Sequence, residues 1–233
     1  MKDPRFVIFD WFSNQATVEA RADFVAQIDP YLAPLIQPGD RVLDLCCGAG
    51  PVAFYLEEQG AQVTGIELAA VPLALAREEA SRRGSKVDFV QADALTHDLG
   101  TSVYDLVVCL GNAIMDFPHQ SFPRFRDRMA DALTPQGRLV LEYRDGLLRV
   151  AQMSEPREVV EQGAEDQILR RFIKYDPALG AYLSEYRNLT TGEAHECTAY
   201  IYTGPLIRIG LESRFRFERS IQLAAARFLD IYA

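Results

Sequence analysis

Residues 41–67 read RVLDLCCGAGPVAFYLEEQGAQVTGIE. The apolar run at residues 42–45 is short and rich in branched side chains, as in a parallel strand that is buried on both faces. A turn with cysteine and glycine follows, and Pro51 stands where a helix should begin, because proline needs no intrahelical partner at the first helical position. Gly60 is well placed to end that helix in a left-handed conformation. The stretch therefore predicts a strand, a turn, a helix and a second strand that ends at Glu67.

A strand, tight turn and helix of this kind bring backbone N–H groups close to a ligand at the carboxyl edge of a sheet. An acid at the end of the second strand can then accept hydrogen bonds from a ribose, and Glu67 is that acid. The sequence therefore predicts a pocket for a nucleoside. The alternative interpretation is a glycine turn that serves only the close packing of strand against helix.

The spacing of the turn residues separates two kinds of nucleoside site. A dinucleotide fingerprint G-x-G-x-x-G laid over residues 46–51 needs three glycines and finds Cys46, Gly48 and Pro51. Residues 44–50 read DLCCGAG instead. This resembles the first motif of the class I S-adenosylmethionine-dependent methyltransferases, usually D/E-x-G-x-G-x-G, with a cysteine in place of the first glycine.

The resemblance implies a set of residues that hold S-adenosyl-L-methionine. In the family an acid just past the third strand meets the adenine amino group, and the backbone of its neighbour meets a ring nitrogen. An arginine on an N-terminal helix that crosses the pocket can meet the methionine carboxylate, although the pattern alone favours a solvated helix face for it. The implied cofactor residues are Arg21, Asp44, Cys46, Gly48, Gly50, Glu67, Leu68, Asp93, Ala94 and Leu110.

A second set of residues is predicted at the methyl acceptor. The segment YDLVVCLGN at residues 104–112 resembles the glycine N-methyltransferase group, and Asn112 follows a strand end that should face the transferred methyl. In that group an arginine after the fifth strand grips the substrate carboxylate, which nominates Arg144. The alternatives are an Asx turn for the asparagine and a salt bridge to Asp145 for the arginine. Tyr143 and Tyr200 complete the predicted substrate-binding residues.

The predicted fold is α/β, with a doubly wound, mostly parallel seven-stranded sheet and an antiparallel β cap inserted after the fifth strand. Three cap strands are expected within residues 168–203, and they must pair antiparallel because their connections are too short for a parallel crossover. The aromatic density of the first twelve residues indicates that they fold over another part of the chain. The single domain is divided into an N-terminal helical lid (1–40), a cofactor-binding core (41–144), the cap (145–204) and C-terminal elements that complete the sheet (205–233).

Composition limits the classes of partner. The 233 residues are 48% hydrophobic, which suits one α/β domain with a sizeable core. A net charge of −9 argues against nucleic acid as a partner and favours a small molecule. The four cysteines have no metal-ligand spacing, the chain opens without an apolar signal region, and no apolar run is long enough for a bilayer. We therefore expect reduced thiols in a cytoplasmic protein without a metal, and homo-oligomerisation stays open.

The predicted function is methyl transfer from S-adenosylmethionine to a small molecule, with an amine nitrogen as the favoured acceptor and a carboxylate on the substrate as a weaker inference. Because the sulfonium already activates the methyl, no nucleophilic residue is needed. The catalytic residues are therefore unknown, and none of the three histidines is assigned a role. Two alternatives remain: a nicotinamide-dependent oxidoreductase, which Cys46 and Pro51 disfavour, and a catalytically silent S-adenosylmethionine-binding module.

Overall fold

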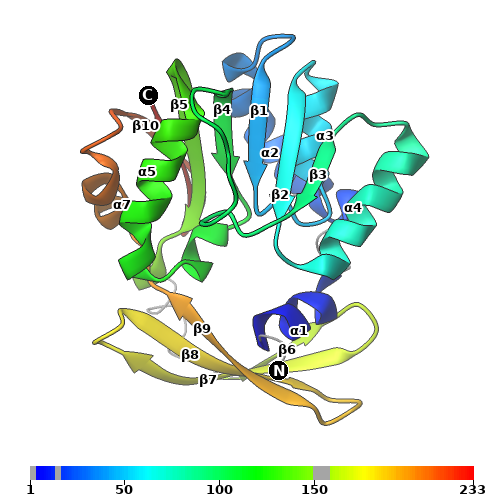
Figure 1. The fold of residues 1–233 in the computed structure, drawn as a ribbon. Coiled ribbons are helices and arrows are strands. Elements are labelled where there is room, and N and C mark those ends of the chain that lie inside the picture. Colours follow the sequence, from blue (N-terminus) through cyan, green and yellow to red (C-terminus); the bar gives the residue numbers. More distant parts are fainter. Residues whose placement is uncertain (1–3, 14–16, 149–157) are drawn as a thin grey trace.

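A computed structural model describes residues 4–13, 17–148 and 158–233, and it contains two sheets (Figure 1). The larger sheet has seven strands in the order β10-β11-β5-β4-β1-β2-β3. Strands β1 to β5 pair in parallel, whereas β11 is antiparallel to both β5 and β10. The strands are β1 (Arg41–Leu45), β2 (Gln62–Glu67), β3 (Asp88–Gln91), β4 (Tyr104–Cys109), β5 (Leu133–Arg144), β10 (Phe217–Ala224) and β11 (Arg227–Tyr232). This is the Rossmann-like methyltransferase topology predicted from the sequence.

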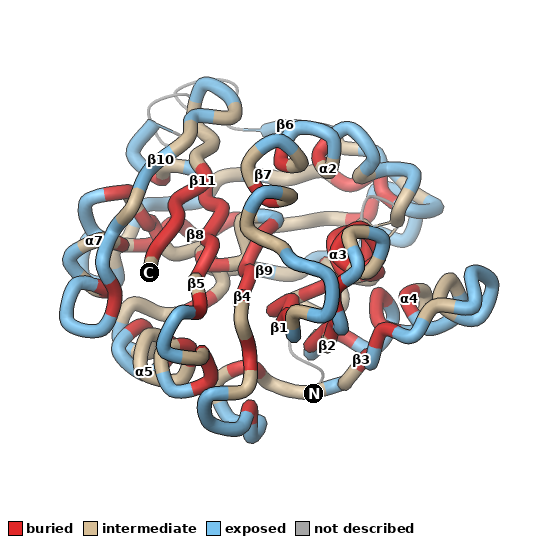
Figure 2. Tube along the Cα trace, turned by 90° about the horizontal axis from the view of Figure 1, so that it is seen from above, coloured by how far each residue is buried: buried red, intermediate tan, exposed pale blue. Residues whose placement is uncertain are grey.

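Helices cover both faces of the large sheet and enclose one apolar core on each face. The first core packs α2, α3 and α4 on the sheet through Phe24, Phe54 and Leu73. The second packs α5 and α7 through Phe125 and Ile207. The central strands are therefore buried, whereas the outer surfaces of the helices are exposed (Figure 2). The helices are α1 (Pro4–Trp11), α2 (Val18–Leu32), α3 (Pro51–Glu58), α4 (Ala70–Arg83), α5 (Phe122–Ala132) and α7 (Gly204–Leu211), with 3-10 segments η2 (Ala33–Leu35), η3 (Ala113–Asp116) and η4 (His119–Ser121).

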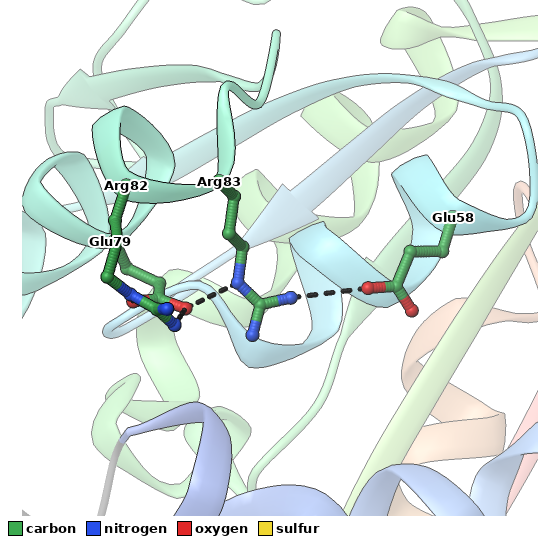
Figure 3. A network of polar contacts seen from close by, with 4 residues as sticks. All are labelled: Glu58, Glu79, Arg82 and Arg83. Atoms are coloured by element: carbon green, nitrogen blue, oxygen red, sulfur yellow. Dashed lines mark hydrogen bonds and ion pairs between the residues drawn. The ribbon is translucent and has the colours of Figure 1, made fainter.

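An arginine network joins the ends of two neighbouring helices. Arg83 at the end of α4 lies between Glu79 of its own helix and Glu58 of α3, with 3.2 Å from Arg83 Nη1 to Glu58 Oε1 (Figure 3). Arg82 also contacts Glu79, at 2.6 Å. Exposed ion pairs of this kind contribute roughly 0–1 kcal/mol each, so the buried cores dominate stability.

The second sheet is an antiparallel cap in the order β6-β7-β8-β9. Its strands are β6 (Glu158–Gln162), β7 (Gln167–Asp176), β8 (Ala181–Asn188) and β9 (Ala194–Tyr200). Helix α1 lies on this sheet, between it and the carboxyl ends of the core strands (Figure 1). The Trp11 ring is 5.5 Å from the ring of His195, and the Phe12 ring is 6.3 Å from that of Tyr186. Residues 4–12 therefore fold over another part of the chain, whereas the first three residues of the predicted segment lie outside the described ranges.

The three expected cap strands are present as β7, β8 and β9, and β6 adds a fourth that the sequence did not predict. Its sequence, EVVEQ, is largely exposed along its length. It therefore lacks the alternation of apolar and polar residues by which a half-buried strand is recognised. Strand β6 is held instead by its register with β7, in which Glu161 pairs with Ile168.

The turn after β1 is left-handed at three alternate residues. Gly48 and Gly50 have φ values of 57° and 82°, and Cys46 has a φ of 57°. A Cβ atom on Gly50 would lie 2.7 Å from the ring of Phe89, so this position needs glycine for space as well as for conformation. The cysteine thus keeps the backbone shape that a glycine adopts readily, at the cost of local strain.

This strain predicts that a glycine at position 46 is more stabilising than an alanine, the reverse of the usual order of these two residues. Cys46→Ala loses the packing of the sulfur and keeps the left-handed strain, whereas Cys46→Gly relieves the strain. We expect the glycine variant to have a free energy of unfolding about 1 kcal/mol higher than the alanine variant. Urea denaturation of both measures this difference. An alanine variant as stable as the glycine variant would contradict the strained turn.

Candidate functional site

A cavity of about 420 Å³ opens at the carboxyl ends of β1, β2, β3 and β4. Its core-side wall is made by the residues that directly follow these strands, from Cys46 to Gly48, from Leu68 to Ala69 and from Ala92 to Leu95. Helices α1 and α2 and the segment at η3 supply the remaining wall. Carboxyl ends of parallel strands are where ligands bind in doubly wound sheets. The size suits a cofactor-sized molecule.

Glu67 ties two loops of this wall together. Its Oε2 atom accepts a hydrogen bond from the N–H of Gly48 at 3.0 Å, and its Oε1 atom accepts one from the N–H of Ala69 at 2.7 Å. An ionised carboxylate has about four lone-pair sites, so each oxygen keeps a site for a ligand hydroxyl. The backbone bonds thus fix the orientation of the carboxylate that the sequence assigned to a ribose.

Asp44 is a buried carboxylate on the cavity wall. Its side chain is 2% exposed, and its Oδ2 atom has no hydrogen-bond partner. Burial, together with the charge of Glu67, raises the pKa of Asp44 to about 8, and a backbone hydrogen bond from Ala53 only partly opposes this rise. A buried acceptor without a partner is costly, so this oxygen favours a ligand that brings a hydrogen-bond donor.

The loop after β3 forms the part of the wall that the sequence assigned to an adenine. Asp93 and Ala94 both line the cavity. The Oδ1 atom of Asp93 accepts a hydrogen bond from the N–H of Leu95 at 2.8 Å, and Nε of Arg128 donates to the carbonyl oxygen of Ala94 at 3.1 Å. The loop is therefore held in shape by its own side chain and by α5.

Arg21 brings a positive charge to the other end of the wall. It lies on α2 and lines the cavity with Phe24. Burial and the nearby charge of Arg227 lower the pKa of Arg21, whereas Glu142 raises it. Glu142 is fully buried, with its Oε1 atom 3.1 Å from Nε of Arg227. Since the one carboxylate of Glu142 is shared by Arg21, Arg144 and Arg227, the position favours an anionic ligand group at Arg21.

Comparisons with known proteins agree with this geometry. Residues 42–137 match a methyltransferase domain family. A ubiquinone biosynthesis O-methyltransferase from Pectobacterium atrosepticum is 41% identical over 73 residues, 31% of this chain and 30% of that protein. A demethylmenaquinone methyltransferase from Thermus thermophilus is 35% identical over 106 residues, 43% of this chain and 46% of that protein. The chain thus matches less than half of the length of either relative.

Over residues 42–137 the chain is therefore similar to methyltransferase domains. Two solved structures share its fold. The PH0226 protein of Pyrococcus horikoshii is 18% identical, with a TM-score of 0.79 over 100% of this chain and 99% of that one. An S-adenosylmethionine-dependent methyltransferase from Clostridium acetobutylicum is 13% identical, with a TM-score of 0.73 over 97% and 95% of the two chains.

The residues of the methyltransferase domain fit S-adenosylmethionine as cofactor. The amino group and the ribose hydroxyls of this molecule are hydrogen-bond donors, and the unpartnered oxygen of Asp44 and the fixed carboxylate of Glu67 are acceptors on the cavity wall. Its carboxylate suits Arg21. Of the predicted cofactor residues, the structure brings together at the cavity all but Gly50, namely Arg21, Asp44, Cys46, Gly48, Glu67, Leu68, Asp93, Ala94 and Leu110. Gly50 lies behind the wall, close to Phe89.

None of the four predicted substrate residues belongs to the cavity lining. Asn112 has a left-handed φ of 64° and joins two strand ends, because its N–H donates to Oε2 of Glu142 at 2.6 Å and its Oδ1 atom accepts from the N–H of Arg144 at 2.7 Å. Tyr143 is buried on the α7 side of the sheet, where its hydroxyl donates to Asp230 at 3.4 Å. The asparagine thus shapes the loop whose neighbours Gly111 and Ala113 line the cavity.

Tyr200 lies at the end of β9, with its ring 5.6 Å from that of His119. It packs the cap against the core near η3, which β9 contacts. A role in substrate binding for any of these four residues stays a prediction.

Sequence reasoning missed the cap-side wall of the cavity. This wall contains side chains from α1 and from the segment at η3: Arg5, Phe6, Phe9, Phe12, Asp116 and Phe117. The aromatic density near the N-terminus was the one available signal for the first group. No sequence motif pointed to Asp116 and Phe117, because only the fold brings the segment at η3 next to α1.

The described ranges, which omit residues 1–3, 14–16 and 149–157, contain no group of three or more His, Cys, Asp or Glu residues arranged to hold a metal. Over the same ranges, no helix is long and apolar enough to cross a membrane. None of the four cysteines, all of which lie in the described ranges, takes part in a disulfide bond.

The raised pKa of Asp44 predicts a pH-dependent stability. Between about pH 4 and pH 8 the folded chain keeps the Asp44 proton that the unfolded chain releases, so the free energy of unfolding should fall as pH rises through this window. Asp44→Asn removes this titration. We therefore expect its stability relative to the unsubstituted protein to increase from pH 5 to pH 9, as measured by urea denaturation without cofactor.

The exposed Asp88 on β3 offers a matched control, since Asp88→Asn makes the same change in charge outside the cavity. Its stability relative to the unsubstituted protein should be nearly independent of pH. If Asp44→Asn behaved in the same way, the buried carboxyl would not have the raised pKa.

Proposed function

We propose that this chain transfers the methyl group of S-adenosylmethionine to a small-molecule acceptor, with an amine nitrogen as the favoured acceptor atom. The observation that carries this proposal is the single cavity wall on which the turn at Gly48, Glu67, Asp93 and Arg21 meet. Asp93 suits an adenine, Glu67 beside the turn at Gly48 suits a ribose, and Arg21 suits a carboxylate, and S-adenosylmethionine contains all three. The family of residues 42–137 supports the same reading.

The chain's own residues have three tasks in this reaction. When bound, the cofactor supplies a methyl group that its sulfonium already activates. Glu67 and the loop after β3 hold the adenosyl part, while Arg21 and Asp44 lie where the amino-acid part would be held. Helix α1, which lies between the cap sheet and the core (Figure 1), supplies part of the cavity wall, and this wall would exclude water and align the acceptor behind the methyl group. No nucleophilic side chain is required.

The nature of the acceptor forms the finer part of the proposal. A nitrogen acceptor follows from the resemblance of residues 104–112 to the glycine N-methyltransferase group. A carboxylate on the acceptor rests on Arg144, which lies at the end of β5 and outside the cavity lining. A hydroxyl acceptor is the second candidate, because several matched relatives are named O-methyltransferases. The cytoplasmic location also stays a prediction.

Binding of S-adenosylhomocysteine tests the proposal directly. Calorimetry should show saturable binding by the unsubstituted protein, and Glu67→Gln should weaken it about tenfold, because the amide has fewer acceptor sites and no charge for the ribose hydroxyls. Asp88→Asn should leave the affinity unchanged. Thermal unfolding of each variant without ligand checks that the loops are intact.

Absence of binding by the unsubstituted protein would remove the methyltransferase proposal. An affinity unchanged by Glu67→Gln would contradict only the ribose assignment. Binding without methyl transfer to any amine or hydroxyl acceptor in a metabolite screen would favour the silent binding module. Binding of reduced nicotinamide dinucleotide in its place would favour the oxidoreductase.

A further inference from the structure

The cap-side wall of the cavity is aromatic. Phe6 and Phe9 of α1 and Phe12 directly after it line this wall, together with Phe117 and Pro118 directly after η3. These three N-terminal side chains are only half-buried, whereas Ile8 of α1 is 5% exposed. Helix α1 therefore turns Ile8 into the protein and presents phenylalanine rings to the cavity.

Contacts on both sides hold this aromatic wall in place. On the cap side, Trp11 and Phe12 pack on the rings of His195 and Tyr186, at 5.5 and 6.3 Å between centroids. On the core side, Nη1 of Arg5 donates to the carbonyl oxygen of Asp116 at 3.3 Å. The rings are thus positioned before any ligand arrives, which lowers the entropic cost of binding against them.

One carboxylate accompanies the rings. Of the four acids that line the cavity, Asp44, Glu67 and Asp93 belong to the core-side wall, whereas Asp116 lies at the end of η3 beside Phe117. The charge of Asp116 contributes, after contact with Cys109, burial and the charge of Glu67, to raising the pKa of the Cys46 thiol. The charge of Asp116 therefore acts on a group at the carboxyl end of β1, on the core side of the cavity.

We propose that the cap-side wall binds an acceptor with an aromatic ring and an amine, with the ring against the phenylalanines of α1 and the amine N–H donating to the carboxylate of Asp116. This inference rests on the proposed function and specifies its substrate class. Aromatic pairs contribute about 0.5–1.5 kcal/mol beyond burial of area, and hydrogen bonds to an ionised acceptor are roughly twice as strong as neutral ones. The transfer uses the unprotonated form of this amine, because the nitrogen lone pair must be available.

The group transfer balances with these residues alone. The nitrogen lone pair forms a bond to the methyl carbon as the carbon–sulfur bond of the cofactor breaks, and the sulfur keeps the bonding pair. The methylated nitrogen then carries a positive charge and gives its proton to the Asp116 carboxylate, from which it passes to water. Asp116 thus has a catalytic role as acceptor of the proton.

Calorimetry on the protein saturated with S-adenosylhomocysteine tests this class with three probes of similar size: benzylamine, cyclohexylmethylamine and benzyl alcohol. Benzylamine should bind about tenfold more tightly than either of the others, since cyclohexylmethylamine lacks the aromatic ring and benzyl alcohol lacks the amine. Equal binding of benzylamine and cyclohexylmethylamine, or no binding of benzylamine, would contradict the proposal that the cap-side wall binds an aromatic ring. Tighter binding of benzyl alcohol than of benzylamine would contradict the proposal that the acceptor carries an amine.

Two variants assign the effects to residues. Phe9→Leu keeps an apolar side chain and should reduce the preference for benzylamine over cyclohexylmethylamine to about twofold or less. Asp116→Asn should reduce the preference for benzylamine over benzyl alcohol in the same way, while Asp88→Asn should leave it unchanged. An unaltered preference in either cavity variant would overturn the corresponding assignment.

The affinity for S-adenosylhomocysteine separates this inference from the proposed function. It should stay within about twofold in Phe9→Leu and Asp116→Asn, because neither residue lies on the core-side wall. Fluorescence of Trp11, the single tryptophan of the chain, reports whether α1 keeps its place in each variant. Loss of S-adenosylhomocysteine binding in the unsubstituted protein would instead remove the proposed function itself.

Discussion

The carboxylate of Glu67, at the end of β2, is the interaction on which the site depends. Its two oxygens accept backbone N–H groups from the loop after β1 and from the start of α4, at 3.0 and 2.7 Å. These bonds hold two loops in one orientation and hold the carboxylate itself toward the cavity. Charge-assisted hydrogen bonds of this kind are among the stronger ones in proteins. The cofactor wall is thus assembled before a ligand binds.

The packing behind this wall explains why the loops come so close. Strand β2 carries Gly65, where a Cβ atom would lie 3.0 Å from Sγ of Cys47 and from the ring of Phe89. Gly50 is restricted by the same ring. Larger residues at either position would push the turn away from β2 and separate Gly48 from Glu67. Gly65 and Gly50 therefore matter because they leave room for neighbouring side chains, and Gly50 also because glycine adopts a left-handed backbone readily.

The cofactor wall could be predicted from the sequence because its parts are local. Most of the predicted residues, such as Asp44 or Asp93, stand within a few positions of a strand end, and the order of strands in a doubly wound sheet then brings these ends together. Arg21, on α2, was nominated only by the family resemblance. The cap-side wall could not be predicted, since Phe9 and Phe117 are more than a hundred residues apart in the chain. Only the position of α1 on the cap brings them to one cavity.

Strand alternation accounts for one predicted substrate residue, Tyr143, that lies away from the cavity. Glu142 and Tyr143 are neighbours in β5, so their side chains point to opposite faces, the first toward Arg227 and the second toward Asp230.

The central claim is that Glu67 holds a ribose at the carboxyl edge of the sheet. A crystal structure with S-adenosylhomocysteine tests it most directly, and the account predicts both ribose hydroxyls within hydrogen-bonding distance of the Glu67 carboxylate. A ribose bound elsewhere, or a corner closed by the protein's own side chains, would contradict it.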